Sequence, residues 1–370
     1  MSAAGNGLWP NKVAALYGIP AALDGAGQCV GIIALGGSYH PDDLTEACKQ
    51  MGRPVPHVVP VSVPVNGATA GYGGGTPDDE EATLDLQVVA GIVPAARIVV
   101  YCAPNSQQGL EAALRAALED GTNNPSVISI SYATAEPSFS DDGFDRVDKM
   151  LMQAGPLGVS VVAAAGDFLA DAGLHDGGAH VAYPASSSFV IGCGGTQITL
   201  TPDGTAIAAE TVWNNGVDRG TDGGRSRFVD VPDYQLKIAL PAPSKPPGTG
   251  RGVPDVAAAA GMNPGYRIVL AGNQKVTGGT SAATPLWAAI IALANARRGK
   301  PLAGAIHSFL YANPQGNLSL RQILHGDNRW QDVGYFAGPG WNACTGWGVP
   351  KGADTIQALA EIPVPNENQP

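Results

Sequence analysis

Residues 277–298, TGGTSAATPLWAAIIALANARR, decide the fold. Gly278 and Gly279 allow a tight turn and the close approach of another backbone, and Ser281 then falls at or near a helix start. Unpaired N–H groups and the helix dipole favour negative charge there. We place Pro285 in the first turn, where a missing N–H costs little, and the apolar run after it predicts a buried helix. Ser281 is then either an N-cap or a nucleophilic hydroxyl group with donors beside it.

The composition indicates a loop-rich globular chain. It has 370 residues, of which 14% are charged, 50 are Gly and 30 are Pro. A net charge of -11 without a basic run argues against nucleic acid as a partner. The chain has no run of eighteen consecutive apolar residues, so we expect no membrane-spanning helix. The N-terminus lacks the charged start and apolar core of a signal peptide. The five cysteines are scattered without zinc spacing, so we expect neither a disulfide framework nor a cysteine-bound metal.

Apolar segments and helical segments alternate through the first half of the chain. The expected strands cover residues 29–35, 97–102, 127–132, 159–165 and 189–193, and the expected helices cover 11–17, 41–51, 80–92, 110–119 and 144–154. This alternation predicts an α/β fold with a central, mostly parallel β-sheet and helices on both faces. Such folds place their chemistry in loops after the strand C-termini. We expect one domain over residues 1–370, with a surface loop at 241–252 and a flexible tail at about 362–370.

Three carboxylates are candidates for chemistry. Glu81 and Asp85 lie on one helical stripe that continues as Val88 and Ile92, so the stripe points inward. Two acids four residues apart usually lie on a solvated face, and their repulsion costs more when they are desolvated. Two acids that are kept on a buried helix despite this cost therefore indicate a functional role for both. Asp167 ends an apolar strand, where a turn or cap role is the ordinary interpretation.

A serine nucleophile normally needs a base, and histidine is the usual one. The chain has six histidines, none of them at the start of an apolar helix: His40, His57, His175, His180, His307 and His325. An ordinary Ser-His-Asp hydrolase is therefore a disfavoured alternative.

Several blocks together resemble the sedolisin family of serine-carboxyl peptidases, in particular its kumamolisin-like branch. Glu81-x-x-x-Asp85, Ala165-Gly166-Asp167 and Gly279-Thr280-Ser281-Ala282 occur in the family's order, among blocks such as GQCVGIIALGGSY, LDLQVVAGIVPAARIVVYCAPN, YPASSSFVIGCGGT, RGVPDVAA and AGPGWNACTGWG. The resemblance runs from about residue 16 to residue 359. It implies a subtilisin-like fold with Ser281 as nucleophile, Glu81 as general base, Asp85 orienting Glu81, and Asp167 in the oxyanion hole. It also implies substrate-binding positions at Ser131, Tyr132, Ala133, Gly279 and Ala182.

The activity that the resemblance implies is that of an acid-acting serine-carboxyl endopeptidase, of EC 3.4.21 type. A carboxylate accepts the serine proton only when it is ionised, whereas Asp167 can donate to an oxyanion only when it is protonated, so the working pH should be acidic. We expect a monomer that acts on proteins or peptides in a secreted or other acidic extracytoplasmic setting. Two alternatives stay open: a tripeptidyl-peptidase, and a catalytically weakened relative that binds peptides in the same groove.

The sequence departs from the family's pattern at several positions. The family's calcium site corresponds to Gln322, Ile323, Gly338, Gly340 and Asn342, where two carboxylates have become amides. Without anionic ligands a hard cation loses affinity, so we expect no bound calcium and no other cofactor, although Asp327 and Asp332 could regroup. The long N-terminal pro-segment of the family has no counterpart, which suggests either a processed form or an unusually short one.

Three further departures concern the acid network and the specificity pocket. A Glu of the network is Ala34 here, a Trp beside it is Tyr132, and an Asp of the primary specificity pocket is Ala182, which predicts a more apolar pocket. In place of calcium, we expect aromatic side chains near the C-terminus to form a packed cluster that braces the loops: Trp330, Tyr335, Phe336, Trp341 and Trp347. The alternative is that these rings merely line surface loops.

Overall fold

A computed structural model of the chain describes residues 7–245, 248–312 and 319–363. The helices are α1 Pro10–Leu16, α2 Pro41–Met51, α3 Pro77–Ile92, α4 Gln107–Leu118, α5 Asp141–Ala154, α6 Thr280–Arg298, α7 Ala305–Leu310 and α8 Ala353–Ala360. The longer strands are β2 Cys29–Leu35, β3 Val58–Ser62, β4 Arg97–Ala103, β5 Val127–Ile130, β7 Ser160–Ala164, β9 Ile191–Leu200, β10 Ile207–Val212, β13 Val256–Ala259, β14 Gly265–Leu270 and β15 Asn273–Thr277. Short two-residue strands are β1 Gly7–Leu8, β6 Thr134–Ala135, β8 Ala182–Tyr183, β11 Gly224–Arg225, β12 Gly252–Val253, β16 Leu320–Arg321 and β17 Val349–Pro350.

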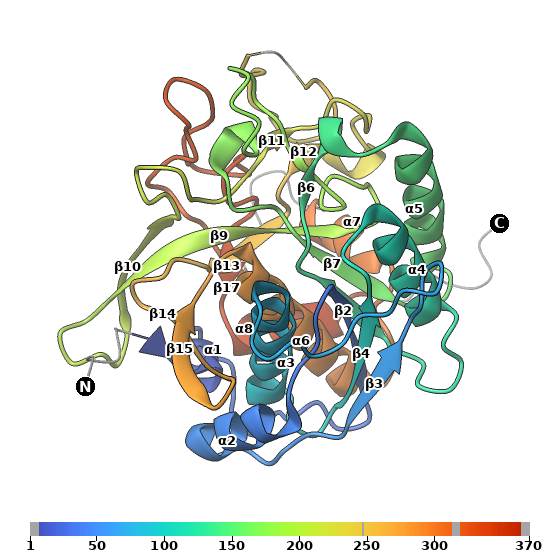
Figure 1. Ribbon diagram of the computed structural model, residues 1–370. Coiled ribbons are helices and arrows are strands. Elements are labelled where there is room, and N and C mark those ends of the chain that lie inside the picture. The colour runs from blue at the N-terminus through green and yellow to red at the C-terminus, as the bar shows by residue number, and fades with distance from the viewer. Residues whose placement is uncertain (1–6, 246–247, 313–318, 364–370) are drawn as a thin grey trace.

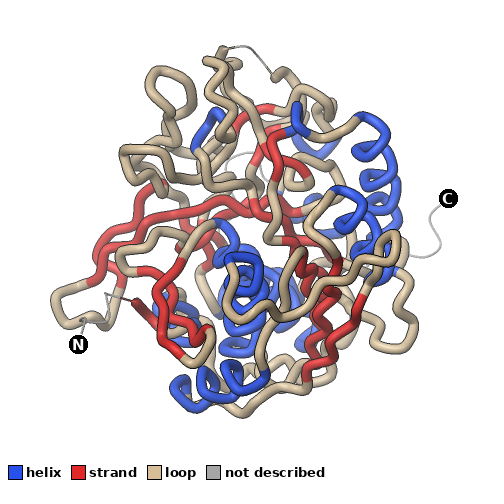
Figure 2. The backbone as a smooth tube through the Cα atoms, in the orientation of Figure 1, coloured by secondary structure: helices blue, strands red, loops and turns tan. Residues whose placement is uncertain are grey.

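One eight-stranded sheet forms the centre of the molecule (Figures 1 and 2). Its strand order is β10-β9-β7-β5-β2-β4-β3, with β13 paired to β9. All of these pairings are parallel except that of β10 with β9. The predicted α/β class with a mostly parallel sheet is thus confirmed.

Helices cover both faces of the sheet, because its central strands are apolar on both sides. In β2, Val30 and Ile32 belong to the apolar cluster that contains α3 and α6, whereas Ile33 and Leu35 belong to the cluster that contains α4 and α5. Period-two alternation sends successive side chains to opposite faces, so a strand buried on both faces reads as a continuous apolar run. This is why the bounds predicted for β2 are also those observed.

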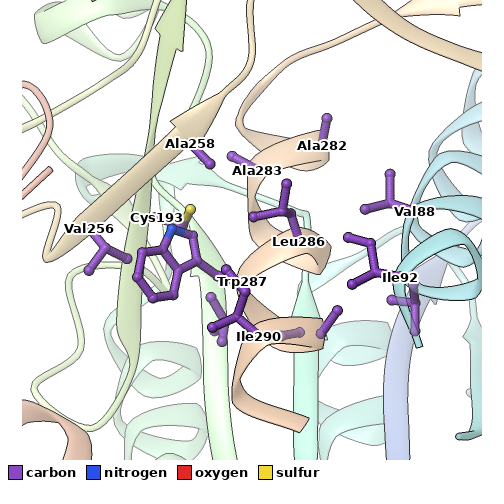
Figure 3. Packing of buried hydrophobic residues seen from close by; sticks show 14 of the residues in the cluster. Val88, Ile92, Cys193, Val256, Ala258, Ala282, Ala283, Leu286, Trp287 and Ile290 are labelled. Atoms are coloured by element: carbon purple, nitrogen blue, oxygen red, sulfur yellow. The ribbon is translucent and has the colours of Figure 1, made fainter. Parts of the chain in front are cut away.

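Helix α6 is buried along sixteen consecutive residues, from Thr280 to Asn295. Figure 3 shows it between α3, which presents Val88 and Ile92, and the strands β9 and β13. The Trp287 indole N–H donates to the Ala257 carbonyl oxygen of β13 at 2.8 Å. The predicted buried helix is confirmed, and its apolar contacts on opposite sides account for its all-round apolar sequence.

The placement of Pro285 in the first turn of this helix is wrong. The helix starts at Thr280, so Pro285 is its sixth residue and lies inside it. A proline removes the N–H that would bond the carbonyl group four residues earlier, here that of Ser281. The Ser131 hydroxyl oxygen lies 3.3 Å from this Ser281 carbonyl oxygen.

Several predicted boundaries differ from those observed. Helix α3 starts at Pro77 rather than residue 80, because Thr76 and Asp79 form a capping box around its N-terminus. Strand β5 ends at Ile130, and β9 runs on to Leu200 as it bends from β7 to β10. The expected tail at 362–370 begins too early, because Ile362 is buried and its carbonyl oxygen accepts a hydrogen bond from Arg298. Residues 364–370 lie outside the described residues.

The expected aromatic cluster near the C-terminus is wrong. Although Tyr335, Trp341 and Trp347 are buried, no ring contact of the described residues joins two of the five rings. Trp330 packs on His175 at 4.8 Å, and Phe336 is 66% exposed. The rings are close in sequence, but each packs against a different neighbour. The part of the chain that the structure describes has no helix long and apolar enough to cross a membrane.

Candidate active site

A cleft of about 470 Å³ lies at the carboxyl ends of the central strands. The segments that follow β5 and β7 line it, together with the first turns of α3 and α6. Parallel sheets place their clefts at this edge. The residues that line the cleft are Pro77, Asp78, Glu81, Asn105, Ser131, Tyr132, Ala133, Ala135, Gly166, Asp167, Phe168, Ala172, Ala182, Asp222, Thr280 and Ser281.

Ser281 presents its hydroxyl group at the floor of this cleft. It is the second residue of α6 and 7% exposed, and its Oγ lies 3.2 Å from the Ser131 carbonyl oxygen. Ser281 also acts on Glu81, because its hydroxyl group lowers the pKa of the Glu81 carboxyl group. The N-cap interpretation of Ser281 is wrong, because Gly279 occupies the N-cap position. Gly279 has φ +103°, a backbone conformation that glycine adopts without strain.

Glu81 and Asp85 are a pair of carboxyl groups on α3, of which Glu81 is half-buried and lines the cleft. Asp85 is fully buried, and its Oδ1 accepts a hydrogen bond of 2.6 Å from the Ser131 hydroxyl group. Glu81 Oε1 and Asp85 Oδ2 are buried without a hydrogen-bond partner among the described residues. An uncompensated buried carboxylate is costly, so a proton held between the two groups would stabilise both.

The pKa values of this pair are both raised. Burial raises the pKa of Glu81, the hydrogen bond from Ser281 lowers it, and the negative charge of Asp167 raises it further. Burial also raises the pKa of Asp85 well above its usual range, and the charge of Glu81 adds to this. The pair therefore stays protonated to a higher pH than two exposed carboxyl groups would.

Asp167 also lines the cleft, three residues after the end of β7. Its Oδ1 accepts hydrogen bonds from the Thr280 N–H at 2.8 Å and from the Thr280 hydroxyl group at 2.7 Å. A Cβ at Gly279 would lie 2.5 Å from Asp167 Oδ2, so this glycine also makes room for the carboxyl group. Burial raises the pKa of Asp167, although the two Thr280 contacts lower it. The interpretation of Asp167 as a helix-capping residue holds in part, since its carboxyl group accepts a hydrogen bond from Thr280, the first residue of α6.

The remaining predicted positions lie in or beside the cleft, but not all in the expected way. Ser131, Tyr132, Ala133 and Ala182 line the cleft, whereas Gly279 lies beneath Asp167. Ser131 binds Asp85 and the Ser281 backbone in addition to facing the cleft. The Tyr132 hydroxyl group exchanges hydrogen bonds with the Leu35 backbone at the end of β2.

Sequence reasoning missed four polar residues of the cleft, which are Asp78, Asn105, Asp222 and Thr280. Thr280 holds Asp167, and Asp222, from a distant loop, hydrogen-bonds the Phe168 N–H at 2.6 Å. No local pattern marks Asp222, which reaches the site only through folding. None of the six histidines, all of which lie in the described ranges, lines the cleft. The cleft therefore offers carboxyl groups as the proton acceptors for Ser281.

The positions that correspond to the family's calcium site are cross-linked by amide groups. Asn342 Nδ2 lies 3.4 Å from both the Ile323 and the Gly338 carbonyl oxygens, and Gln322 Oε1 accepts from the Gly340 N–H at 3.1 Å. The Asn342 Oδ1 accepts from the backbone of Cys344. This donor set does not fit a hard cation, because an amide N–H is directed at two of the carbonyl oxygens that would have to bind it.

The two nearby aspartates do not form a substitute site. Asp327 accepts hydrogen bonds from the Asn214 side chain and the Arg329 backbone, and Asp332 lies 3.5 Å from Lys245. Within the described ranges there is no group of three or more His, Cys, Asp or Glu side chains placed to hold a metal ion.

Comparisons with known proteins place this fold and site in a class. A sequence profile of the subtilase family matches residues 67–319, which is more than half of the chain. The structure of a Pseudomonas sedolisin, a serine-carboxyl proteinase in complex with two molecules of pseudo-iodotyrostatin, superposes with a TM-score of 0.83 at 26% identity. This superposition covers 96% of this chain and 98% of that one. The class is thus that of subtilisin-like α/β proteins, as predicted.

Comparison of the sequence with individual relatives identifies the family within the subtilisin-like class. Kumamolisin from Bacillus sp. (strain MN-32) is 41% identical over 375 aligned residues, which cover all of this chain and 66% of kumamolisin. Tripeptidyl-peptidase 1 from Macaca fascicularis is 29% identical over 87% of this chain and 58% of its own length. The chain thus spans less than two thirds of these relatives. It belongs to the sedolisin family and is kumamolisin-like, so the resemblance noted in the sequence is confirmed.

Proposed function

We propose that this chain is the catalytic domain of an acid-acting serine-carboxyl endopeptidase. The observation that carries the proposal is the convergence on one cleft of the Ser281 hydroxyl group with carboxyl groups and no histidine. The 41% identity to kumamolisin supports the same activity. Peptides and proteins are the proposed substrates, and the working form is a monomer in an acidic extracytoplasmic compartment.

In the proposed reaction, Glu81 and Asp85 share one proton and one negative charge. The ionised oxygen of Glu81 takes the Ser281 proton as Oγ attacks the scissile carbonyl carbon. Asp85 orients Glu81 and is itself fixed by the Ser131 hydroxyl group. When the C–N bond breaks, Glu81 returns the proton to the leaving amine. Water then hydrolyses the acyl-enzyme by the same proton path.

Asp167 stabilises the oxyanion of the tetrahedral intermediate. Its Oδ1 is occupied by the two Thr280 contacts, so Oδ2 is the oxygen that would carry the proton. A protonated carboxyl group donates to the oxyanion, whereas an ionised one would repel it. The cleft also carries small apolar side chains, Ala133, Ala172 and Ala182, which suit an apolar substrate side chain before the cleaved bond.

Mapping of cleavage products tests this activity and separates it from its alternatives. A mixture of peptides with free and acetylated N-termini, digested at acidic pH and analysed by mass spectrometry, should show internal cleavage in both, preferentially after apolar residues. The Ser281→Ala variant is the control and should leave the mixture intact. Release of tripeptides from free N-termini alone would favour a tripeptidyl-peptidase, and binding without cleavage would favour the weakened relative.

We also propose that the protein folds and acts without calcium or another cofactor. The amide contacts of Asn342 and Gln322 take the place of the ion in tying the C-terminal loops together. Thermal melts of the Ser281→Ala variant should therefore show the same Tm with excess chelator and with micromolar calcium. A Tm that falls with chelator, or rises with calcium, would contradict the proposal.

A further inference from the structure

A second carboxyl group, that of Asp222, lies beside Asp167, and the proposed reaction does not use it. Asp222 is 2% exposed and lines the cleft on the Asp167 side. The charged groups that act on it are Asp167, Asp171 and Arg219. Asp222 is thus close enough to Asp167, the proposed oxyanion donor, for the charges of the two carboxyl groups to interact.

Asp222 belongs to a segment that runs along the turn carrying Asp167. The Gly220 N–H donates to the Asp167 carbonyl oxygen at 3.1 Å, and the Asp222 N–H donates to the Gly166 carbonyl oxygen at 3.0 Å. The Asp222 side chain adds a third contact, because its Oδ1 accepts from the Phe168 N–H at 2.6 Å. Asp222 therefore holds the residues on both sides of Asp167, since it donates to Gly166 and accepts from Phe168.

The other oxygen of Asp222 packs directly on the same turn. A Cβ at Gly166 would lie 2.1 Å from Asp222 Oδ2, and Gly166 has φ +110°. Both the backbone conformation and the carboxyl group thus require glycine before Asp167. The turn at Gly166 and Asp167 therefore packs closely against the Asp222 carboxyl group.

We propose that Asp222 is a positioning residue for Asp167 and that it acts as a neutral carboxyl group. The inference rests on the proposed function, since Asp167 is its target. Burial raises the pKa of Asp222 well above its usual range, the Phe168 N–H lowers it, and the charge of Asp167 raises it. An ionised Asp222 would add negative charge next to the developing oxyanion, whereas a neutral one fixes the turn without that repulsion.

Two substitutions separate positioning from charge. Asp222→Asn keeps an oxygen that can accept from Phe168 and is neutral at every pH, whereas Asp222→Ala removes the acceptor. We expect kcat of the asparagine variant to stay near that of the wild type at the acidic optimum. The alanine variant should lose about tenfold to a hundredfold in kcat with KM little changed, because a small displacement of a catalytic group costs this much.

The matched controls are Asp218→Asn and Asp218→Ala. Asp218 is exposed on the same loop and contacts Asn215 rather than the Asp167 turn, so both variants should act like the wild type. Equal losses in the two Asp222 variants would show that a charged carboxylate is required, and wild-type kcat in both would remove the positioning role. Either result overturns the inference. If the alanine variant does not fold, loss of kcat in the asparagine variant still contradicts the inference.

Stability against pH gives a readout that does not depend on activity. A carboxyl group whose pKa is raised by folding contributes stability at low pH and loses it as pH rises through the folded pKa. In the Ser281→Ala background, Asp222→Asn should therefore gain Tm relative to its parent as pH rises above about 4, where an unfolded aspartate ionises. A constant Tm difference would contradict the neutral carboxyl group. If the wild type cleaves no peptide, the proposed function fails, and this melt still tests the protonation state of Asp222.

Discussion

Replacement of Ser281 by alanine is expected to lower kcat for peptide hydrolysis by about 10⁴-fold or more, because nucleophile and base act as one unit. Ser281 and Glu81 line the same cleft, and removal of Ser281 Oγ takes away the oxygen that would form the acyl-enzyme. Glu81→Gln should cost a similar factor, since an amide cannot accept the proton. The measurement is kcat on an internally quenched peptide at acidic pH.

The double variant and a matched serine provide the controls. Ser281→Ala combined with Glu81→Gln should be little worse than either single variant, because each already removes the concerted step. Ser308→Ala, which alters a serine away from the cleft, should retain full activity. Retention of more than about one hundredth of the wild-type kcat by Ser281→Ala would contradict the assignment of the nucleophile.

Substitution of Asp167 is expected to have the second largest effect. Asp167→Ala should lower kcat by about 10²- to 10³-fold, the usual cost of one oxyanion donor, with a smaller change in KM. Asp167→Asn should lose less, because its amide N–H can donate to the oxyanion. Asparagine does not ionise, so this variant should also retain activity at a higher pH than the wild type. Both are measured as kcat and KM against pH.

The outcome for the asparagine variant decides the role of Asp167. If both variants lose activity equally and keep the wild-type pH dependence, Asp167 does not act as a donor. The Thr280 contacts to Oδ1 would then be its main contribution, as an ordinary helix cap. Circular dichroism melts of both variants separate this structural role from the catalytic one.

The sequence predicts the elements whose burial leaves a local signature. The apolar run of β2 and the all-round apolar face of α6 reflect contacts on both of their sides, so their positions follow from hydropathy alone. Helix α3 is of the same kind only in part, because it is buried at every residue from Ala82 to Ile92 rather than along one stripe, and Glu81 is half-buried. In these cases the residue pattern records the surroundings directly.

Features that depend on chain segments far apart in sequence leave no such signature. Asp167 and Asp222 meet only because β7 and the distant loop fold against each other, so no spacing marks Asp222. The expected aromatic cluster failed for the converse reason: Trp330 and Phe336 are neighbours in sequence, but their rings contact His175 and Arg329 instead. Proximity along the chain does not determine which rings pack together.

The pH dependence of kcat/KM tests the carboxyl mechanism most directly. The pair Glu81 and Asp85 must lose one proton for the base to act, so the rate should rise with pH at the acidic end. Asp167 must keep its proton, so the rate should fall as pH passes the raised pKa of Asp167. Measured from about pH 3 to pH 9, the wild type should give a bell-shaped profile that peaks on the acidic side of neutrality. A rate that instead climbs to a plateau above pH 7 would contradict the carboxyl mechanism and require a base of a different kind.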